Sequence, residues 1–243
     1  MIRAAIVTVF LALCTLLLGL PLILYTLLTR SAAPLYWTGV RSVVMAGRIA
    51  GMRVRAEGRE NIPPGVCLFV SNHTSNMDIL ALLSVIPRRI AFVAKESLFR
   101  IPLVGTAFRL AHFVPIDRSR RRTAMASIDQ AVQWIKQGTS FLVFPEGTRS
   151  ADGRLLPFKT GSFVMAVEAG VPVVPVVCIG AHRVMSKGSL TIRPGEVVVR
   201  FGTPIDVPEV RAEDRGEVSR RVHDALAALL PEDQKPAGGA DES

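Results

Sequence analysis

Two side chains able to exchange a proton follow a short apolar run. Residues 66–70 (VCLFV) predict a buried strand, and residues 72–78 (NHTSNMD) come directly after it. A carboxylate that hydrogen-bonds a histidine fixes the ring tautomer and stabilises the ring once it has taken a proton. His73 and Asp78 are therefore candidates for a general base and its orienting group. The alternative is that Asp78 or Asn76 simply caps the helix that follows.

A second polar cluster follows another apolar run. Residues 145–150 (PEGTRS) come directly after a strand predicted at residues 141–144. Gly147 lets the backbone approach a ligand, and Arg149 can bind a phosphate through two hydrogen bonds. An ordinary exposed turn would have a similar composition. We favour an anion-binding loop, because active sites of open α/β sheets collect at the carboxyl ends of strands, where both clusters lie.

The elements that must position these clusters alternate along the chain. Short apolar runs alternate with helical patterns, which predicts an α/β domain with a largely parallel sheet flanked by helices. Pro194 and Gly195 separate two short runs, which predicts a late β-hairpin. The predicted strands are residues 66–70, 90–94, 112–116, 141–144, 173–179, 191–193 and 197–201, and the predicted helices are residues 78–86, 122–137, 161–168 and 218–230.

The amino-terminal segment predicts a membrane anchor. No charged residue lies between Arg3 and Arg30, and an apolar helix of this length covers a bilayer core of about 30 Å. Pro21 predicts a kink or a re-entrant path. A cleaved signal peptide, with residues 31–33 (SAA) as the cleavage site, is the alternative. Its apolar part is usually only about 7–15 residues, so we favour the anchor.

The next segment has a mixed pattern that predicts an amphipathic helix. Arg41 and Arg48 are seven residues apart on one helical face, opposite apolar residues, while Tyr36 and Trp37 suit the level of lipid headgroups. We interpret it as an interfacial helix that completes a two-helix membrane motif; a core helix of the domain is the alternative. The predicted divisions are a membrane-anchoring helix at residues 1–30, the amphipathic helix at 31–55, the α/β domain at 56–230 and a disordered tail at 231–243.

Charge and cysteine content indicate the surroundings of the domain. The net charge of +9 favours an anionic partner, and the chain lacks nucleic-acid-binding motifs, so we expect an anionic membrane surface and no nucleic acid. Only Arg3 precedes the anchor, whereas six arginines lie between residues 30 and 59, which predicts an inner-membrane protein with its domain on the cytoplasmic side. Cys14, Cys67 and Cys178 lie in apolar runs, so we expect packing rather than a disulfide or a metal site.

Four motifs in order together resemble the glycerolipid acyltransferase family, in particular the bacterial 1-acyl-glycerol-3-phosphate acyltransferases. The resemblance covers about residues 55–205 and includes the amino-terminal two-helix motif. One departure is Thr74, where many members carry glutamine. The motifs are the His-x4-Asp sequence in residues 72–78, residues 95–105 (KESLFRIPLVG) leading into 114–118 (VPIDR), residues 144–150 (FPEGTRS) and residues 171–176 (VPVVPV).

The resemblance implies the reaction and its participants. The acyl group of a thioester would pass to the 2-hydroxyl of 1-acyl-glycerol 3-phosphate (lysophosphatidic acid), giving phosphatidate for phospholipid biosynthesis. His73 would be the general base and Asp78 its orienting group, with no acyl-enzyme, metal or cofactor. Acyl-coenzyme A or acyl carrier protein would be the co-substrate. The residues implied in binding the acceptor's phosphate are Lys95, Arg118, Glu146, Gly147, Thr148 and Arg149.

Several alternatives stay open at this level. The acceptor could be another lysolipid, such as a lyso-ornithine lipid. The same base could activate water, which would make the protein a hydrolase. A membrane-surface lipid-binding protein without catalysis is a third alternative, and the intact His73–Asp78 pair argues against it. Arg118 could belong to a solvated basic run at residues 118–122 that meets anionic headgroups rather than the substrate.

Overall fold

A mixed sheet of seven strands forms the centre of the protein, in a computed structural model that describes residues 1–117, 121–207 and 215–237. The strand order is β1-β7-β6-β2-β5-β3-β4, and every neighbouring pair is parallel except β6 with β7. This confirms the predicted largely parallel α/β sheet. The strands are β1 Met52–Glu57, β2 Leu68–Ser71, β3 Ile90–Lys95, β4 Val114–Ile116, β5 Ser140–Val143, β6 Val173–Ile179 and β7 Gly195–Phe201.

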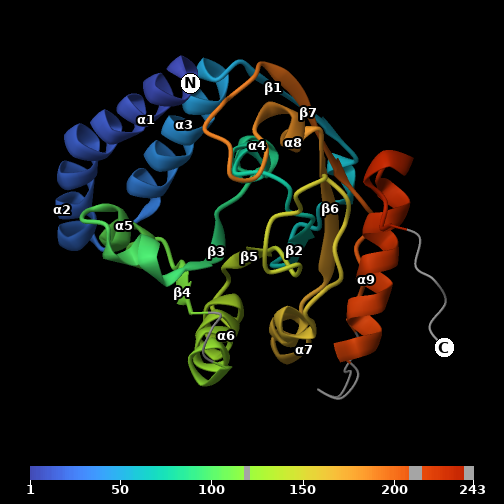
Figure 1. The fold of residues 1–243 in the computed structure, drawn as a ribbon. Coiled ribbons are helices and arrows are strands. Elements are labelled where there is room, and N and C mark those ends of the chain that lie inside the picture. The colour runs from blue at the N-terminus through green and yellow to red at the C-terminus, as the bar shows by residue number, and fades with distance from the viewer. Residues whose placement is uncertain (118–120, 208–214, 238–243) are drawn as a thin grey trace.

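Helices cover both faces of the sheet, as Figure 1 shows. On one face α3 (Ala33–Ile49), α4 (Met77–Val85) and α8 (Ala181–Val184) pack with the start of the chain on one apolar core. On the other face α6 (Arg121–Lys136), α7 (Val164–Ala169) and α9 (Arg215–Leu229) bury a second core. A shorter helix, α5 (Val104–Leu110), lies beside the sheet edge. The central strands β2, β5 and β6 are consequently buried from both sides, which explains their nearly unbroken apolar sequences.

The amino-terminal segment is one long helix with a widened turn. Its parts are α1 (Ile2–Cys14), a π-helical turn (Thr15–Gly19) and α2 (Leu20–Thr29). Pro21 has no N–H, and its ring would clash with the carbonyl four residues earlier in a regular helix, so the wider turn accommodates it. Among the described residues this is the one helix long and apolar enough to cross a membrane. The predicted kink at Pro21 thus takes the form of a π-bulge.

Helix α3 lies alongside this first helix and is fixed to the sheet by Tyr36 (Figure 1). The Tyr36 hydroxyl donates to the Ile90 carbonyl at 3.2 Å and accepts from the Ile90 N–H at 2.9 Å. Burial raises the pKa of this hydroxyl. The expectation that Tyr36 lies at the headgroup level was wrong, because both hydrogen bonds hold its ring inside the domain. The helix still packs against the amino-terminal helix, as expected of the second helix in the predicted pair.

Two local predictions were wrong around the outer strands. Residues 191–193 form no strand, and β7 lies between β1 and β6 instead of in a hairpin. Strand β1 was missed, and its first four residues fall in the segment 31–55 predicted as helix. The helix ends at Ile49 because Gly51 turns the chain with a φ of 83°. A six-residue strand gives little periodicity, and its partner β7 lies more than 140 residues further along the chain. Local sequence therefore could not reveal this pairing.

Part of the predicted disordered tail packs on the domain. Residues Glu232–Gln234 form a 3-10 turn, and Gln234 is buried. The Gln234 carbonyl accepts a hydrogen bond from the Leu155 N–H at 2.9 Å, and Arg183 pairs with Asp233 at 2.7 Å. The rest of that predicted tail, residues 238–243, lies outside the described residues. The ordered turn instead holds the loop that follows β5.

Candidate active site

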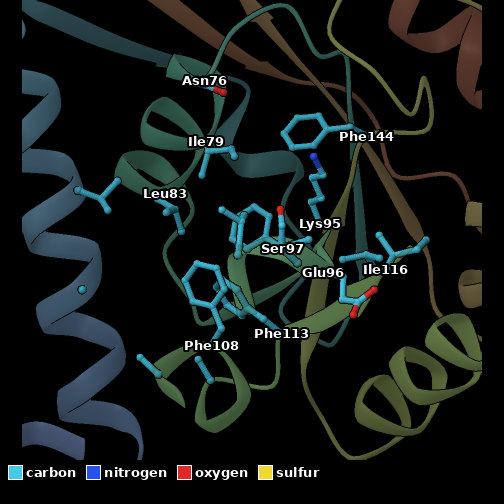
Figure 2. Close-up of a pocket in the computed structure, with 18 of the residues that line it drawn as sticks. Asn76, Ile79, Leu83, Lys95, Glu96, Ser97, Phe108, Phe113, Ile116 and Phe144 are labelled. Carbon is cyan, nitrogen blue, oxygen red and sulfur yellow. The ribbon is translucent and has the colours of Figure 1, made fainter. Parts of the chain in front are cut away.

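The carboxyl ends of β2, β5 and β3 bring the predicted site residues to one edge of the sheet. These three strands are parallel neighbours, so the loops that follow them emerge together. His73 follows β2, Phe144 follows β5, and Lys95 ends β3. Figure 2 shows the Lys95 side chain directed toward the Phe144 ring at the mouth of a cavity. The sheet's topology thus places together residues that are up to 71 positions apart.

The His73–Asp78 pair forms as expected. The Nδ1 atom of His73 lies 2.9 Å from the Oδ2 atom of Asp78, whose side chain is 0 % exposed. The same oxygen accepts hydrogen bonds from the N–H groups of Thr74 at 2.7 Å and Ser75 at 2.8 Å. The Asn76 side chain makes no capping hydrogen bond. Because the carboxylate engages Nδ1, the proton-accepting position of the neutral ring is Nε2.

The loop after β5 braces His73 from three sides. The imidazole stacks on the Phe144 ring with centroids 4.0 Å apart. The His73 N–H donates to Oε1 of Glu146 at 2.7 Å, and the His73 carbonyl accepts from the Ser150 N–H at 2.7 Å. The backbone and the ring of His73 are therefore both fixed before any ligand binds, which is the preorganisation that proton transfer requires.

Glu146 has a different place from the one expected of a phosphate ligand. Its side chain is 3 % exposed, and its second oxygen accepts from the Leu156 N–H at 3.3 Å. Burial raises the pKa of this carboxyl to about 8; the nearby Asp78 charge adds to the rise, and the two backbone hydrogen bonds oppose it. Glu146 points into the protein and joins two loops. The carboxyl does not line the cavity.

The other predicted phosphate ligands line the cavity, with one exception. Gly147, Thr148, Arg149 and Lys95 all line it, and because none of them is buried they form its rim. Gly147 has a φ of 73°, a left-handed conformation that favours glycine. Arg118 lies outside the described residues. The side chains of Lys95 and Arg149 and the turn at Gly147 therefore line the cavity that leads to His73.

The cavity itself is large and mostly apolar. Its volume is about 900 Å³, within the range of about 300–1,000 Å³ usual for small-molecule sites. Figure 2 shows how α4 and the aromatic residues near β4 form its walls. It reaches from His73 to α3, the helix that packs beside the amino-terminal helix. The apolar lining includes Leu35, Val40, Val43, Ile79, Leu83, Phe108 and Phe113.

Asn72 is a site residue to which the sequence analysis gave no role. Its amide is 1 % exposed and bridges to β6: Nδ2 donates to the Cys178 carbonyl at 3.1 Å, and Oδ1 accepts from the Cys178 N–H at 2.8 Å. This pair of bonds fixes the loop that carries His73. The signal available in the sequence was a polar amide between a buried strand and His73, but its partner is 106 residues away.

The cysteines of the domain are placed for packing. Cys67 and Cys178 are buried, and burial raises the pKa of the Cys67 thiol to about 11. Neither is therefore a thiolate nucleophile near neutral pH. In residues 1–117, 121–207 and 215–237, no three histidine, cysteine or carboxylate side chains are grouped to hold a metal ion.

The fold and site define a class of protein: an α/β domain that holds a base beside a cation-rimmed apolar cavity. The acyltransferase family model matches residues 53–179. The chain is 34 % identical to the 1-acyl-sn-glycerol-3-phosphate acyltransferase of Limnanthes douglasii over 196 residues, 80 % of this chain and 69 % of that protein. It is 33 % identical to the human alpha enzyme of the same name over 75 % of this chain and 65 % of that one.

A solved structure extends the likeness to the whole molecule. The crystal structure of the 1-acyl-sn-glycerophosphate (LPA) acyltransferase PlsC from Thermotoga maritima matches with a TM-score of 0.77 and 31 % identity. The match covers 94 % of this chain and 95 % of that one. The chain therefore belongs to the acyltransferase family.

The raised pKa of Glu146 predicts a pH-dependent stability. Folded protein keeps a proton on Glu146 that the unfolded chain releases above its ordinary pKa of 4.5. Its contribution to stability is full below about pH 4.5 and is lost as the pH rises toward about 8. Glu146→Gln carries no titrating proton. Subtracting the variant's free energy of unfolding from that of the wild type should give a value that declines from pH 5 to 8, by up to about 1.4 kcal/mol per pH unit.

Chemical denaturation of both proteins at four pH values measures this difference. Glu168→Gln, a change at an exposed carboxylate on α7, is the control and should give a flat difference. A flat difference for Glu146→Gln as well would show that Glu146 is ionised in the folded protein at pH 5.

Proposed function

We propose that the protein transfers a fatty acyl group from an acyl thioester to the 2-hydroxyl of 1-acyl-glycerol 3-phosphate, giving phosphatidate. The observation that best supports this reaction is a fixed histidine base that faces an apolar cavity, with Lys95 and Arg149 at the cavity's rim. Such a site matches an acceptor with one hydroxyl, one apolar chain and one phosphate. The names of the relatives support the same reaction.

In this proposal the acyl group passes directly from the donor to the acceptor, without a covalent enzyme intermediate. Nε2 of His73 takes the proton of the acceptor hydroxyl while Asp78 stabilises the charged ring. The oxygen attacks the thioester carbonyl, and the tetrahedral intermediate collapses by breaking the carbon–sulfur bond. The departing thiolate then takes the proton from the imidazolium, which restores the base. Atoms and charges balance, and no cofactor takes part.

The cations at the rim specify the acceptor in this proposal. Arg149 and Lys95 bind the phosphate, and the Gly147–Thr148 turn brings backbone close to it. A lysolipid without a phosphate, such as a lyso-ornithine lipid, offers these cations one carboxylate in place of a phosphate and would pair with them less completely. We therefore favour the phosphate-bearing acceptor. The donor is a fatty acyl thioester of coenzyme A or of acyl carrier protein.

We further propose that the amino-terminal helix attaches the protein to an anionic membrane surface, with the domain on the cytoplasmic side of the inner membrane. The helix runs over Ile2–Thr29 and most of its large side chains face outward, among them Leu17, which is 68 % exposed. The arginines that follow the helix support this orientation by their number. The apolar cavity reaches α3 beside this helix, so a lipid acceptor has a short path from the membrane.

Loss of the base tests the mechanism. His73→Ala should lower acyl transfer about 10²–10⁴-fold, because proton transfer by a positioned base contributes about that much. The assay follows free thiol release with 1-acyl-glycerol 3-phosphate as acceptor, and thermal unfolding verifies the fold. His223→Ala, on α9 against Phe158, should retain activity. Retained turnover in His73→Ala would contradict this mechanism. Free fatty acid as the main product of the wild type would identify a hydrolase instead.

Loss of the rim arginine tests the acceptor. Arg149→Met should raise KM for 1-acyl-glycerol 3-phosphate about 10- to 100-fold, because a charged hydrogen bond to phosphate is lost. The KM for an uncharged lysolipid, such as a monoacylglycerol, should not change. Arg154→Met, an exposed arginine in the same loop that pairs with Asp152, is the matched control. An unchanged KM in Arg149→Met would remove Arg149 from the phosphate site.

A charge on the outward face of the first helix tests the membrane proposal. Leu17→Asp should move the protein from the membrane to the soluble fraction, because an aspartate at the centre of a membrane helix costs about 2.5–3.5 kcal/mol. Met125→Asp, on α6 at the other face of the sheet and 42 % exposed, should stay with the membrane. Flotation on vesicles with anionic lipid measures both. Equal flotation of both variants would contradict insertion of this helix.

A further inference from the structure

A second, smaller cavity lies on the opposite face of the sheet from the large one. Its volume is about 170 Å³, and Ile128 of α6 and Met165 of α7 form its walls. The large cavity is lined from the other face, by α3 and α4. The two cavities share four lining residues, Val93, Ile116, Phe144 and Gly147. They therefore meet at the carboxyl ends of the strands, beside the His73 ring that stacks on Phe144.

The small cavity has a cation of its own. Lys159 lines it, and its ammonium lies 3.2 Å from the position that a Cβ atom on Gly147 would take. The Lys159 N–H donates to the Pro145 carbonyl at 2.9 Å, which fixes this residue to the same loop. Lys95 lines the large cavity and not the small one. The loop after β5 thus has one ammonium group on each side of it.

The proposed reaction needs space for two substrates, and each carries a phosphate. The acceptor's phosphate is assigned to the rim of the large cavity. The donor's thioester is joined to a phosphate through a pantetheine arm, which is the same in coenzyme A and in acyl carrier protein. A volume of about 170 Å³ is too small for a whole ligand, but it can hold one segment of a narrow chain. Ser162 adds a hydroxyl to its lining, which suits the amide groups of such an arm.

We propose that the small cavity receives one segment of the phosphopantetheine arm of the acyl donor and that Lys159 binds its phosphate. This assignment rests on the proposed acyl transfer. The arm then lies on the α6–α7 face and the acyl chain on the α3–α4 face, so the thioester crosses the edge of the sheet next to His73. The acceptor phosphate and the donor phosphate are held by different lysines on opposite sides of one loop.

Two synthetic donors that differ only in the phosphate test the assignment. Acyl-phosphopantetheine and acyl-pantetheine are compared as donors for the wild type and for Lys159→Met. The variant should raise KM for acyl-phosphopantetheine about 10-fold and leave KM for acyl-pantetheine and for the acceptor unchanged. Lys136→Met, at the exposed end of α6, removes the same charge and should change none of the three. An equal rise for both donors, or a rise in the acceptor KM, would overturn the assignment.

A second variant tests the cavity itself. Ser162→Phe should fill the small cavity and raise KM for both donors, and Ser162→Ala, which removes only the hydroxyl, should raise both by a smaller factor. Calorimetry with phosphopantetheine alone gives a readout without turnover: Kd should rise in both Lys159→Met and Ser162→Phe. An unchanged Kd in these variants would overturn the site. A wild type that binds phosphopantetheine in this way but transfers no acyl group would refute the proposed function and leave the site standing.

Discussion

A buried carboxylate is the constraint on which the site depends. Asp78 has no contact with water, and burying such a group is costly unless its oxygens are hydrogen-bonded. Two backbone N–H groups and the His73 ring meet that requirement, so the loop after β2 keeps one conformation. Asn72 fixes the start of the same loop to β6, and Glu146 holds its backbone from the β5 side. The base is thus positioned by the sheet rather than by a substrate.

The same strand ends divide the space around the base into two parts. The large cavity opens toward α3 and the amino-terminal helix, and the small one opens between α6 and α7. Because the loop after β5 forms part of the wall between them, a movement of that loop would change both cavities and the His73 backbone. The 3-10 turn at Glu232–Gln234, which binds the Leu155 N–H, limits this movement.

Elements with strong local patterns were predictable, and those without were not. The buried strands β2, β3, β5 and β6 showed as runs of apolar residues, and α6 showed by its apolar face. The outer strand β1 was missed and a hairpin was wrongly placed at residues 191–201, because the partner of β7 is distant in sequence. Tyr36 was assigned to the membrane interface, where its ring type is common, yet two hydrogen bonds to Ile90 keep it inside.

The sequence by itself determined the chemistry: the His73–Asp78 pair, the loop with Gly147 and Arg149, and the resemblance to an acyltransferase family all follow from residue types in order. Only the tertiary structure decided what the neighbouring residues do. The Glu146 carboxyl binds the His73 backbone instead of lining the cavity, and the Asn72 amide binds the backbone of β6. Lys159 faces a second cavity. The physical reason is that each of these roles depends on a contact or cavity shared between segments distant in sequence. Residue type and spacing carry no record of such contacts until the sheet brings the strand ends together.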